Sequence, residues 1–284
     1  MRIAVTGGSG KLGRSVVQVL RDAGHDVFVL DLAATPGNPA LGGIRVDLTN
    51  AGEVADVLSG VDEHYDALDA VVHLAAIPAP GMFSNTATFH NNMLAGFNVF
   101  EGARKAGIKR IVHASSETVL GLPFDVPPPY LPVDEEYAPR PNSTYSLVKY
   151  LEEKMAAELC RWDPELSITG LRFSNVMEPQ DYAQFPGFDA DPRSRHWNLW
   201  GYIDARDGGQ AVLKALETRG PGYEVFIIAN ADTVMSRSSA SLAAEVFPGV
   251  EVRHELGEHE TLLSIDKAKR MLGYAPRYDW RSQL

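Results

Sequence analysis

The sequence predicts an α/β fold in which helices cover both faces of a doubly wound parallel sheet. Short apolar segments rich in Val and Ile alternate along the chain with longer stretches of helical periodicity. Such apolar runs are typical of strands that are buried on both faces of a parallel sheet. The alternation indicates right-handed crossover connections, because consecutive parallel strands must be joined across a face of the sheet. With 284 residues, the chain can bury one substantial core.

The expected elements follow one another in β-α order. The strands are Arg2–Val5, Asp26–Leu30, Gly43–Val46, Ala70–Leu74, Arg110–Ala114, Ile168–Phe173 and Glu224–Ile228. The helices are Leu12–Ala23, Ala51–Val57, Phe89–Ala106, Tyr145–Cys160, Arg206–Leu216 and Ser238–Val246.

Two long stretches interrupt this rhythm. Residues 123–141 are rich in Pro, and residues 178–200 carry the aromatic side chains Phe185, Phe188, Trp197 and Trp200. Loops of this length in a compact domain are usually functional. We therefore expect both stretches to form walls of a substrate pocket, with tolerated surface insertions as the alternative.

The composition excludes several classes of partner. The net charge of −11 argues against nucleic acid, which requires a dense basic patch. The single Cys160 excludes an intramolecular disulfide and a multi-cysteine metal site, and no metal is expected. No apolar run approaches the ~20 residues that span a bilayer. With no secretory signal pattern at the start, we expect a cytoplasmic protein and no membrane partner.

A glycine-rich turn follows the first expected strand. The sequence Thr-Gly-Gly-Ser-Gly-Lys-Leu-Gly occupies residues 6–13 and opens the first helix. Glycine there allows a tight turn, close approach of a pyrophosphate and close packing of the helix on the strand. The phosphates would lie at a helix N-terminus, which carries a partial positive charge. This context predicts a Rossmann-type dinucleotide site, with cofactor contacts from Gly7, Gly10, Lys11, Leu12 and Gly13.

An acidic residue at the end of the second strand indicates which dinucleotide binds. A carboxylate at Asp31 can accept hydrogen bonds from the ribose hydroxyls and would repel a 2′-phosphate. We therefore expect NAD. Lys11 and Arg14 lie nearby in sequence, so NADP stays open as the less favoured alternative. A Walker motif is excluded, since Lys11 is followed by Leu12, which has no hydroxyl for magnesium.

A tyrosine and a lysine form the expected catalytic pair. Tyr145 and Lys149 are four residues apart at the start of an expected helix, so they share one face. The lysine should lower the pKa of the phenol, which can then act as a base. Ser116 follows an expected strand at the carboxyl edge, where it can hydrogen-bond the reacting oxygen. Tyr150 and Lys154 repeat the spacing, but we interpret them as helix surface.

With these residues in place, the chain resembles the extended short-chain dehydrogenase/reductase family, also called the NAD-dependent epimerase/dehydratase family. The resemblance covers nearly the whole length. It implies a catalytic triad of Ser116, Tyr145 and Lys149. It also implies a homodimer formed through the helices Phe89–Ala106 and Tyr145–Cys160. Residues that it places at the cofactor are Asp47, Leu48, Leu74, Ala75, Ala76, Asn92, Tyr145, Lys149, Phe173 and Asn175.

The resemblance also implies that the chain has two portions with different functions. Residues 1–170 would form the NAD-binding Rossmann domain. Residues 171–284 would form a small C-terminal substrate-binding portion, interleaved with the last strands of the sheet.

Departures from the family pattern narrow the activity. The 4,6-dehydratases carry an Asp-Glu pair after the catalytic hydroxyl residue, whereas Glu117 and Thr118 stand here, which argues against dehydration. The short stretch between Asn175 and Tyr202 leaves little room for a nucleotide, so a smaller substrate is expected. The nearest small-substrate resemblance is to uronate dehydrogenases. Residues expected at the substrate are Ser116, Glu117, Asn175 and, for a carboxylate, Arg193 or Arg195.

Three functions are compatible with these features. The first is an NAD-dependent oxidoreductase that acts on a small hydroxylated substrate such as a sugar or a uronic acid. The second is a nucleotide-sugar epimerase that keeps its NAD tightly bound. The third, a sensor without catalysis, is disfavoured because a sensor needs no phenol and lysine beside a nicotinamide.

Overall fold

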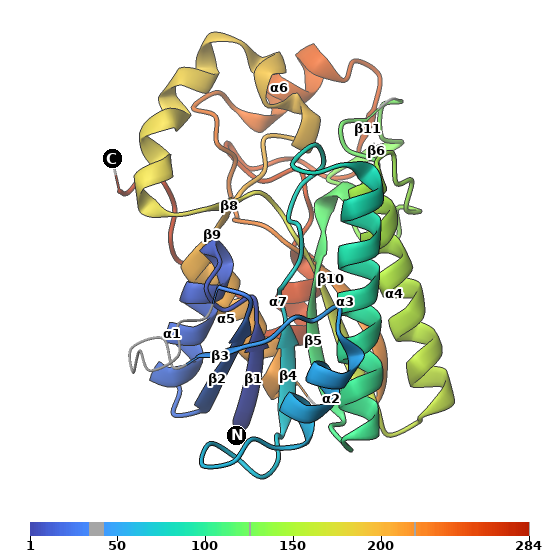
Figure 1. The fold of residues 1–284 in the computed structure, drawn as a ribbon. Coiled ribbons are helices and arrows are strands. Elements are labelled where there is room, and N and C mark those ends of the chain that lie inside the picture. The colour runs from blue at the N-terminus through green and yellow to red at the C-terminus, as the bar shows by residue number, and fades with distance from the viewer. Residues whose placement is uncertain (34–42, 125, 219, 284) are drawn as a thin grey trace.

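The computed structural model describes residues 1–33, 43–124, 126–218 and 220–283. It confirms the α/β fold, with a seven-stranded sheet in the order β10-β7-β5-β4-β1-β2-β3 (Figure 1). All neighbouring strands in this sheet are parallel. The strands are β1 (Arg2–Thr6), β2 (Asp26–Asp31), β3 (Gly43–Arg45), β4 (Ala70–His73), β5 (Arg110–Ser116), β7 (Ser167–Phe173) and β10 (Gly222–Ile228). The strand order reverses between β1 and β4, which opens a crevice at their carboxyl ends.

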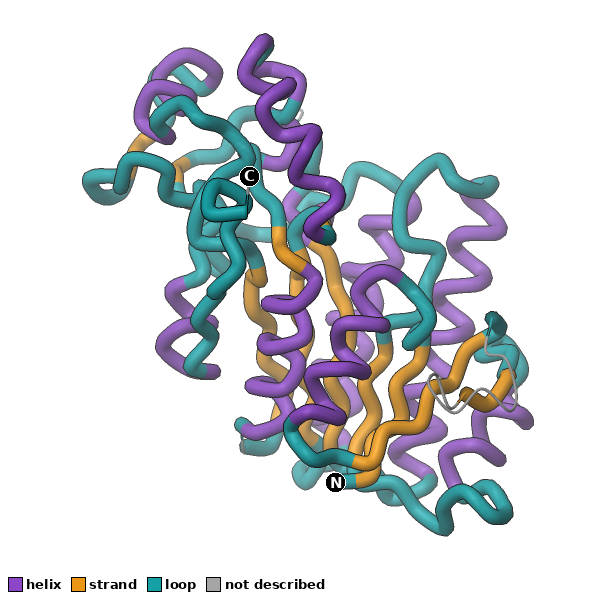
Figure 2. The backbone as a smooth tube through the Cα atoms, turned by 90° about the vertical axis from the view of Figure 1, so that its left-hand side faces the viewer, coloured by secondary structure: helices purple, strands orange, loops and turns teal. Residues whose placement is uncertain are grey.

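Helices cover both faces of this sheet (Figure 1, Figure 2). Helices α1 and α5 pack against each other over one face, and α2, α3 and α4 lie over the other. Two apolar cores result, one on each side of the sheet. The helices are α1 (Lys11–Asp22), α2 (Ala51–Ser59), α3 (Asn85–Lys105), α4 (Thr144–Trp162) and α5 (Ala205–Glu217). Among the described residues, no helix is long and apolar enough to cross a membrane.

Most of the chain after β7 forms a cap above the carboxyl ends of the strands, at the top of Figure 1. The predicted boundary at residue 170 falls inside β7, and β10 returns from the second portion to the sheet. The two portions therefore share the sheet. Further elements of the structure are β6 (Tyr130–Leu131), β8 (Val176–Met177), β9 (Ile203–Asp204), α6 (Ser239–Val246), β11 (Glu251–Val252) and α7 (Asp266–Leu272).

The aromatic stretch 178–200 is part of this cap. It folds into short 3-10 helices at Pro179–Ala190, Pro192–Ser194 and His196–Asn198. Phe185 and Trp200 are completely buried in the core. The expectation that these two side chains line a pocket is therefore wrong, because they stabilise the cap itself. Phe188 and Trp197 are only partly buried.

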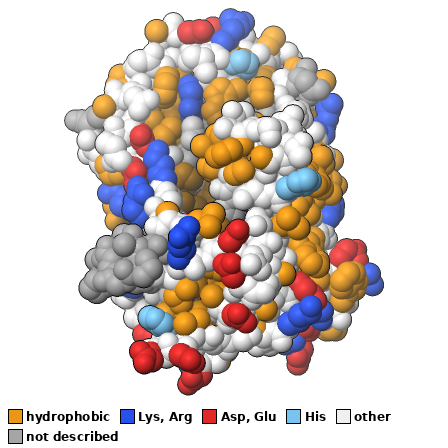
Figure 3. All heavy atoms as spheres, viewed as in Figure 1, with side chains coloured by type: hydrophobic (Ala, Val, Ile, Leu, Met, Phe, Trp, Pro, Cys, Tyr) orange, Lys and Arg blue, Asp and Glu red, His pale blue; other side chains and the backbone are white. Residues whose placement is uncertain are grey.

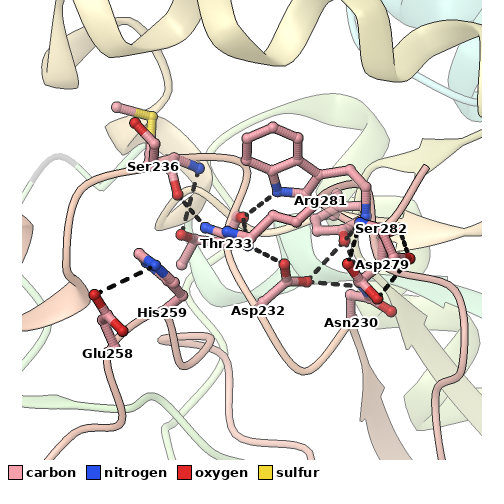
Figure 4. Close-up of polar contacts among 12 residues, drawn as sticks. Asn230, Asp232, Thr233, Ser236, Glu258, His259, Asp279, Arg281 and Ser282 are labelled. Atoms are coloured by element: carbon pink, nitrogen blue, oxygen red, sulfur yellow. Dashed lines mark hydrogen bonds and ion pairs between the residues drawn. The ribbon is translucent and has the colours of Figure 1, made fainter. Parts of the chain in front are cut away.

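The last residues of the chain fasten the cap to the end of β10 (Figure 4). The Asn230 amide donates to Asp232 at 2.9 Å, and Arg281 forms an ion pair with Asp232. The indole nitrogen of Trp280 donates to the Thr233 carbonyl at 2.8 Å. The shallow pocket in this region is bordered by none of the predicted catalytic residues. We interpret this network as structural.

Candidate active site

The glycine-rich turn lies against the end of β4. Gly7 has a φ of +69°, and a Cβ atom there would come within 2.6 Å of the Ala75 nitrogen. At Gly13 a Cβ atom would come within 2.1 Å of the Gly7 carbonyl oxygen. Gly10 caps α1 without a side-chain hydrogen bond, so the first amides of the helix stay available. This cradle, which larger side chains would fill, fits a pyrophosphate.

The predicted ribose residue lies beside this turn, and two further predicted cofactor residues follow β3 in the chain. The Asp31 carboxylate accepts hydrogen bonds from the backbone nitrogens of Ser9 at 3.1 Å and Ala33 at 3.0 Å. It therefore lies beside the turn, where a ribose would be. Asp47 accepts hydrogen bonds from Thr49, which hold the pKa of Asp47 below its ordinary value. Leu48 is buried, and its carbonyl accepts from Asn98.

The segment that follows β4 is braced on both sides. The Thr6 hydroxyl accepts from the backbone nitrogens of Leu74 at 3.2 Å and Ala75 at 3.3 Å. The buried Asn92 side chain bonds both the nitrogen of Ile77, at 2.8 Å, and its carbonyl oxygen, at 3.1 Å. Residues 74–77, including Ala76, are thus held next to the glycine-rich turn. Asn92 acts here as a brace for the predicted cofactor site.

The structure brings the predicted catalytic residues together. Strand β5 extends two residues beyond its predicted end, so Ser116 lies within the strand and pairs in register with Phe173 of β7. Helix α4 starts one residue before Tyr145, and the Ser143 side chain caps it. The Ser116 hydroxyl lies close enough to the Tyr145 phenol to lower its pKa, and Lys149 follows one turn later on α4. Tyr145 and Lys149 are both buried.

Burial controls the ionisation of Tyr145. It raises the pKa of the phenol, and the lowering effects of Lys149 and of the Ser116 hydrogen bond are smaller. Glu152 and Glu117 raise this pKa further. Lys149 thus lowers the pKa of Tyr145 in the expected direction, but the pKa still lies above its ordinary value. The reason is that Tyr145 is only 7% exposed, so burial has the larger effect.

Sequence reasoning missed the partner of Lys149. Its ammonium bonds the Glu152 carboxylate at 2.9 Å, and both side chains are buried. The i, i+3 spacing on one expected helix was the available signal. By contrast, Lys154 of the alternative pair is exposed and lies 5.0 Å from the centre of the Tyr150 ring.

A second polar cluster follows Ser116. Glu117 is 3% exposed and accepts a hydrogen bond of 3.2 Å from the Asn198 amide. Arg195 is buried, with its guanidinium 5.1 Å from the centres of both the Phe188 and Trp197 rings. One Glu117 oxygen, the Arg195 Nε and the Asn198 Oδ1 have no hydrogen-bond partner within the described part of the chain. These atoms are available to a ligand or to ordered water.

The structure distinguishes the two candidate arginines. Arg195 is buried close enough to Glu117 for its charge to lower the pKa of that carboxyl, whereas Arg193 is exposed. Burial has the larger effect and raises the pKa of Glu117 to about 7, against the smaller lowering effects of its polar neighbours Ser174, Asn198 and the Asn175 backbone. Ser174 lies between the predicted cofactor residues Phe173 and Asn175, which was the available signal. Asn198 carried none, because only the folding of the cap brings it to Glu117.

Two ion pairs join the glycine-rich turn to the cap. Lys11 bonds Asp181 at 2.5 Å and the Val176 carbonyl at 3.2 Å, and Arg14 bonds Glu178 at 3.0 Å. Lys11 thus contacts the cap, in addition to its predicted place at the cofactor. Figure 3 shows basic side chains gathered between the sheet and the cap, beside a hollow. Such a border favours an anionic ligand. No group of His, Cys, Asp and Glu is arranged to hold a metal in the ranges that the structure describes.

Comparisons with known proteins give a consistent picture. Residues 3–192 match the model of the NAD dependent epimerase/dehydratase family. The UDP-glucose 4-epimerase of Bacillus subtilis is 31% identical over 213 residues, which cover 72% of this chain and 60% of that protein. The UDP-glucose 4-epimerase of Corynebacterium glutamicum is 25% identical over 315 aligned positions, which cover 98% of this chain and 92% of that protein. The matches span only 50 to 64% of the length of five such relatives.

Solved structures share the fold. A crystal structure of UDP-galactose 4-epimerase is 27% identical, with a TM-score of 0.70 over 100% of this chain and 96% of that chain. A short-chain dehydrogenase/reductase superfamily protein from Agrobacterium tumefaciens with bound NAD is 21% identical, with a TM-score of 0.74 over 100% and 95% of the two chains. At 21% identity the second likeness concerns the fold alone.

The raised pKa of Glu117 predicts a pH-dependent stability. Since its folded-state pKa is about 7 and its ordinary value 4.5, its contribution is complete below pH 4.5 and is lost as the pH rises through 7. Over this window the wild type should lose roughly 3 kcal/mol relative to Glu117→Gln. Denaturant unfolding at a series of pH values measures the difference. The exposed Glu258→Gln serves as the control, and parallel curves for wild type and Glu117→Gln would contradict the prediction.

Proposed function

Because the chain belongs to the NAD dependent epimerase/dehydratase family, we propose that it transfers a hydride between NAD and a hydroxyl-bearing carbon of a carbohydrate. The observation that carries this proposal is the meeting of Ser116, Tyr145 and Lys149 beside the glycine-rich turn. Ligands of doubly wound folds bind at this carboxyl edge of the sheet.

Each of the three residues has a chemical role in the proposed reaction. The Tyr145 phenolate accepts the proton of the substrate hydroxyl, and the Ser116 hydroxyl hydrogen-bonds the same oxygen. The Lys149 ammonium stabilises the phenolate. Bound NAD supplies the acceptor for the hydride that leaves the carbon. In the reverse direction Tyr145 returns the proton, so the same residues serve reduction.

The cofactor residues favour NAD over NADP. The Asp31 carboxylate lies beside the turn and offers its oxygens to ribose hydroxyls, whereas a 2′-phosphate would be repelled. Lys11 and Arg14, the nearby cations, are engaged by Asp181 and Glu178 of the cap. They are therefore less available to a phosphate on the ribose.

Two overall reactions are compatible with this chemistry. Epimerisation of a nucleotide sugar is the better supported, because relatives that are 31% and 30% identical are described as UDP-glucose 4-epimerases. Oxidation of a small acidic sugar is supported by Arg195, a buried cation next to Glu117 that matches a carboxylate. The stretch 178–200, which packs its own aromatic side chains into the cap, favours a compact substrate.

A substrate panel tests the proposal. Purified protein is incubated with UDP-glucose, UDP-galactose and free hexuronates, with and without added NAD. An epimerase interconverts the UDP-sugars without net NADH, because it reduces its own intermediate again. A dehydrogenase accumulates NADH in proportion to the hexuronate consumed. Absence of both products with every panel member would contradict the proposed function.

The choice of base predicts the effect of two tyrosine substitutions. Tyr145→Phe removes the proton acceptor, and turnover should fall by at least ~100-fold while NAD still binds. Tyr150→Phe, one residue after Lys149 on the same helix, should leave turnover nearly unchanged. Initial rates, together with NAD affinity measured by calorimetry, check both variants. Full activity of Tyr145→Phe would show that another residue is the base.

The chain is proposed to form a homodimer through α3 and α4. These helices lie side by side (Figure 1), and their exposed apolar residues include Leu94, Phe97 and Leu147. Neighbouring apolar side chains of this kind are typical of an interface. Leu94→Glu combined with Phe97→Glu should convert a dimer to a monomer in light scattering, because two charges would be buried. Met271→Glu on α7 is the control, and a monomeric wild type would refute the proposal.

A further inference from the structure

A buried carboxylate lies directly on the catalytic lysine. The Glu152 Oε2 atom is 2.9 Å from the Lys149 ammonium, with side-chain exposures of 1% and 3%. Helix α3 provides the space at Gly96, where a Cβ atom would come within 3.1 Å of Glu152 Oε1. That Oε1 atom has no hydrogen-bond partner among the described residues. The one direct bond that the structure gives this carboxylate is therefore to Lys149.

The neighbouring glutamate on α4 is bonded in a different way. Glu153 accepts two hydrogen bonds from Arg172, at 2.9 and 2.8 Å, and one from Ser115 at 2.6 Å. Glu153 thus joins α4 to β5 and β7 without contact to the catalytic lysine. Both carboxylate oxygens of Glu153 are hydrogen-bonded, whereas Glu152 leaves one oxygen free and bonds the group that acts on Tyr145.

Among the charged groups around Lys149, Glu152 has the largest effect on the pKa of its ammonium. His73 on β4 and His113 on β5 have their pKa values lowered by burial and then by the charge of Lys149, which keeps both imidazoles neutral. Burial raises the pKa of Tyr223 on β10, so this phenol is also uncharged. Helix α3 contributes Gly96, which has no side chain. Glu153 on α4 is paired with Arg172 on β7, and its effect in raising the pKa of Lys149 is smaller than that of Glu152. Glu117 acts on Tyr145 from beyond β5.

We propose that Glu152 is a positioning residue for Lys149: its carboxylate holds the ammonium beside Tyr145 and keeps it protonated. The inference rests on the proposed function of Tyr145 and Lys149. Glu152 thereby sets the pH range over which the tyrosine–lysine pair can work. A buried amine without a counter-ion would lose its proton more readily, because burial disfavours the charged form.

The ionisation of the two partners supports this role. Burial by itself lowers the pKa of Lys149, but the charge and hydrogen bond of Glu152 reverse this, and the pKa lies above its ordinary value. The same charge raises the pKa of Tyr145. Removing it should therefore let both groups lose protons at lower pH.

The test measures the two ionisations directly. Lysine labelled with ¹³C at Cε and tyrosine labelled at Cζ are titrated by NMR in the NAD-free full chain. Lys149→Arg and Tyr145→Phe assign the signals. In Glu152→Gln, which keeps the shape of the side chain, we expect the proton affinity of Lys149 to fall about tenfold or more. The Tyr145 signal should titrate at lower pH as well.

A matched control lies on the same helix. Glu158 pairs with Arg161 at the same i, i+3 spacing, but both side chains are more than half exposed, at 55% and 68%. Glu158→Gln should leave both titrations unchanged. Lys149 and Tyr145 titrations that coincide in wild type and Glu152→Gln would overturn the proposal. If Glu152→Gln is not folded by circular dichroism, the equally neutral Glu152→Met replaces it, and an unchanged Lys149 titration there would overturn the proposal in the same way.

The titration separates this proposal from the proposed function. Because it needs no substrate, it reports on Glu152 even if the substrate panel is inactive. With an active substrate, the alkaline limb of the kcat/KM profile should move to lower pH in Glu152→Gln, with a smaller change at the optimum. A profile that coincides with that of the wild type would overturn the positioning role and leave the function of Tyr145 intact.

Discussion

At Gly13 the first turn of α1 lies so close to the glycine-rich turn that a Cβ atom would approach the Gly7 carbonyl oxygen to 2.1 Å. At Gly7, where a Cβ atom would come within 2.6 Å of the Ala75 nitrogen, the turn itself passes close to the segment that follows β4. These two contacts determine where α1 begins and where residues 74–77 run. They also leave the amides of the helix N-terminus free for an anion. The carboxyl edge of the sheet becomes a site because the backbone, and not a side chain, fills the space there.

The catalytic groups add a second constraint, which is electrostatic. Tyr145 and Lys149 are buried, and a buried charge is costly unless it is paired. The chain places Glu152 on Lys149 and Glu153 on Arg172, so the two cations at this edge each have a carboxylate. The pairing keeps Lys149 charged but also opposes ionisation of Tyr145. The ionisation of Tyr145 is thus set by burial and by the opposite charges of Lys149 and Glu152.

The cap adds the groups that would meet a substrate. Its folding brings Arg195 and Asn198 to Glu117, the residue that follows the catalytic serine. The aromatic residues of the cap divide between two tasks: Phe185 and Trp200 form its core, while Phe188 and Trp197 flank the guanidinium of Arg195. Ion pairs from Lys11 and Arg14 then hold the cap over the glycine-rich turn. These ion pairs connect the predicted cofactor site at the glycine-rich turn to the cap.

The sequence by itself determined the order of strands and helices along the chain and the glycine-rich turn, because both rest on local periodicity or on a short motif. Signals of the same kind predicted the roles of Asp31 and of Ser116, Tyr145 and Lys149. All seven predicted strands of the large sheet are present, with ends that differ by a few residues. Only the tertiary structure decided that burial dominates the pKa of Tyr145, that Glu152 bonds Lys149, and that Arg195 rather than Arg193 is buried near Glu117. The approach of Arg195 to Glu117 depends on contacts between segments far apart in the chain, which residue spacing does not encode. The i, i+3 spacing places Glu152 and Lys149 on one face of α4, but only the packing of α4 against α3 and the sheet buries them together with Tyr145.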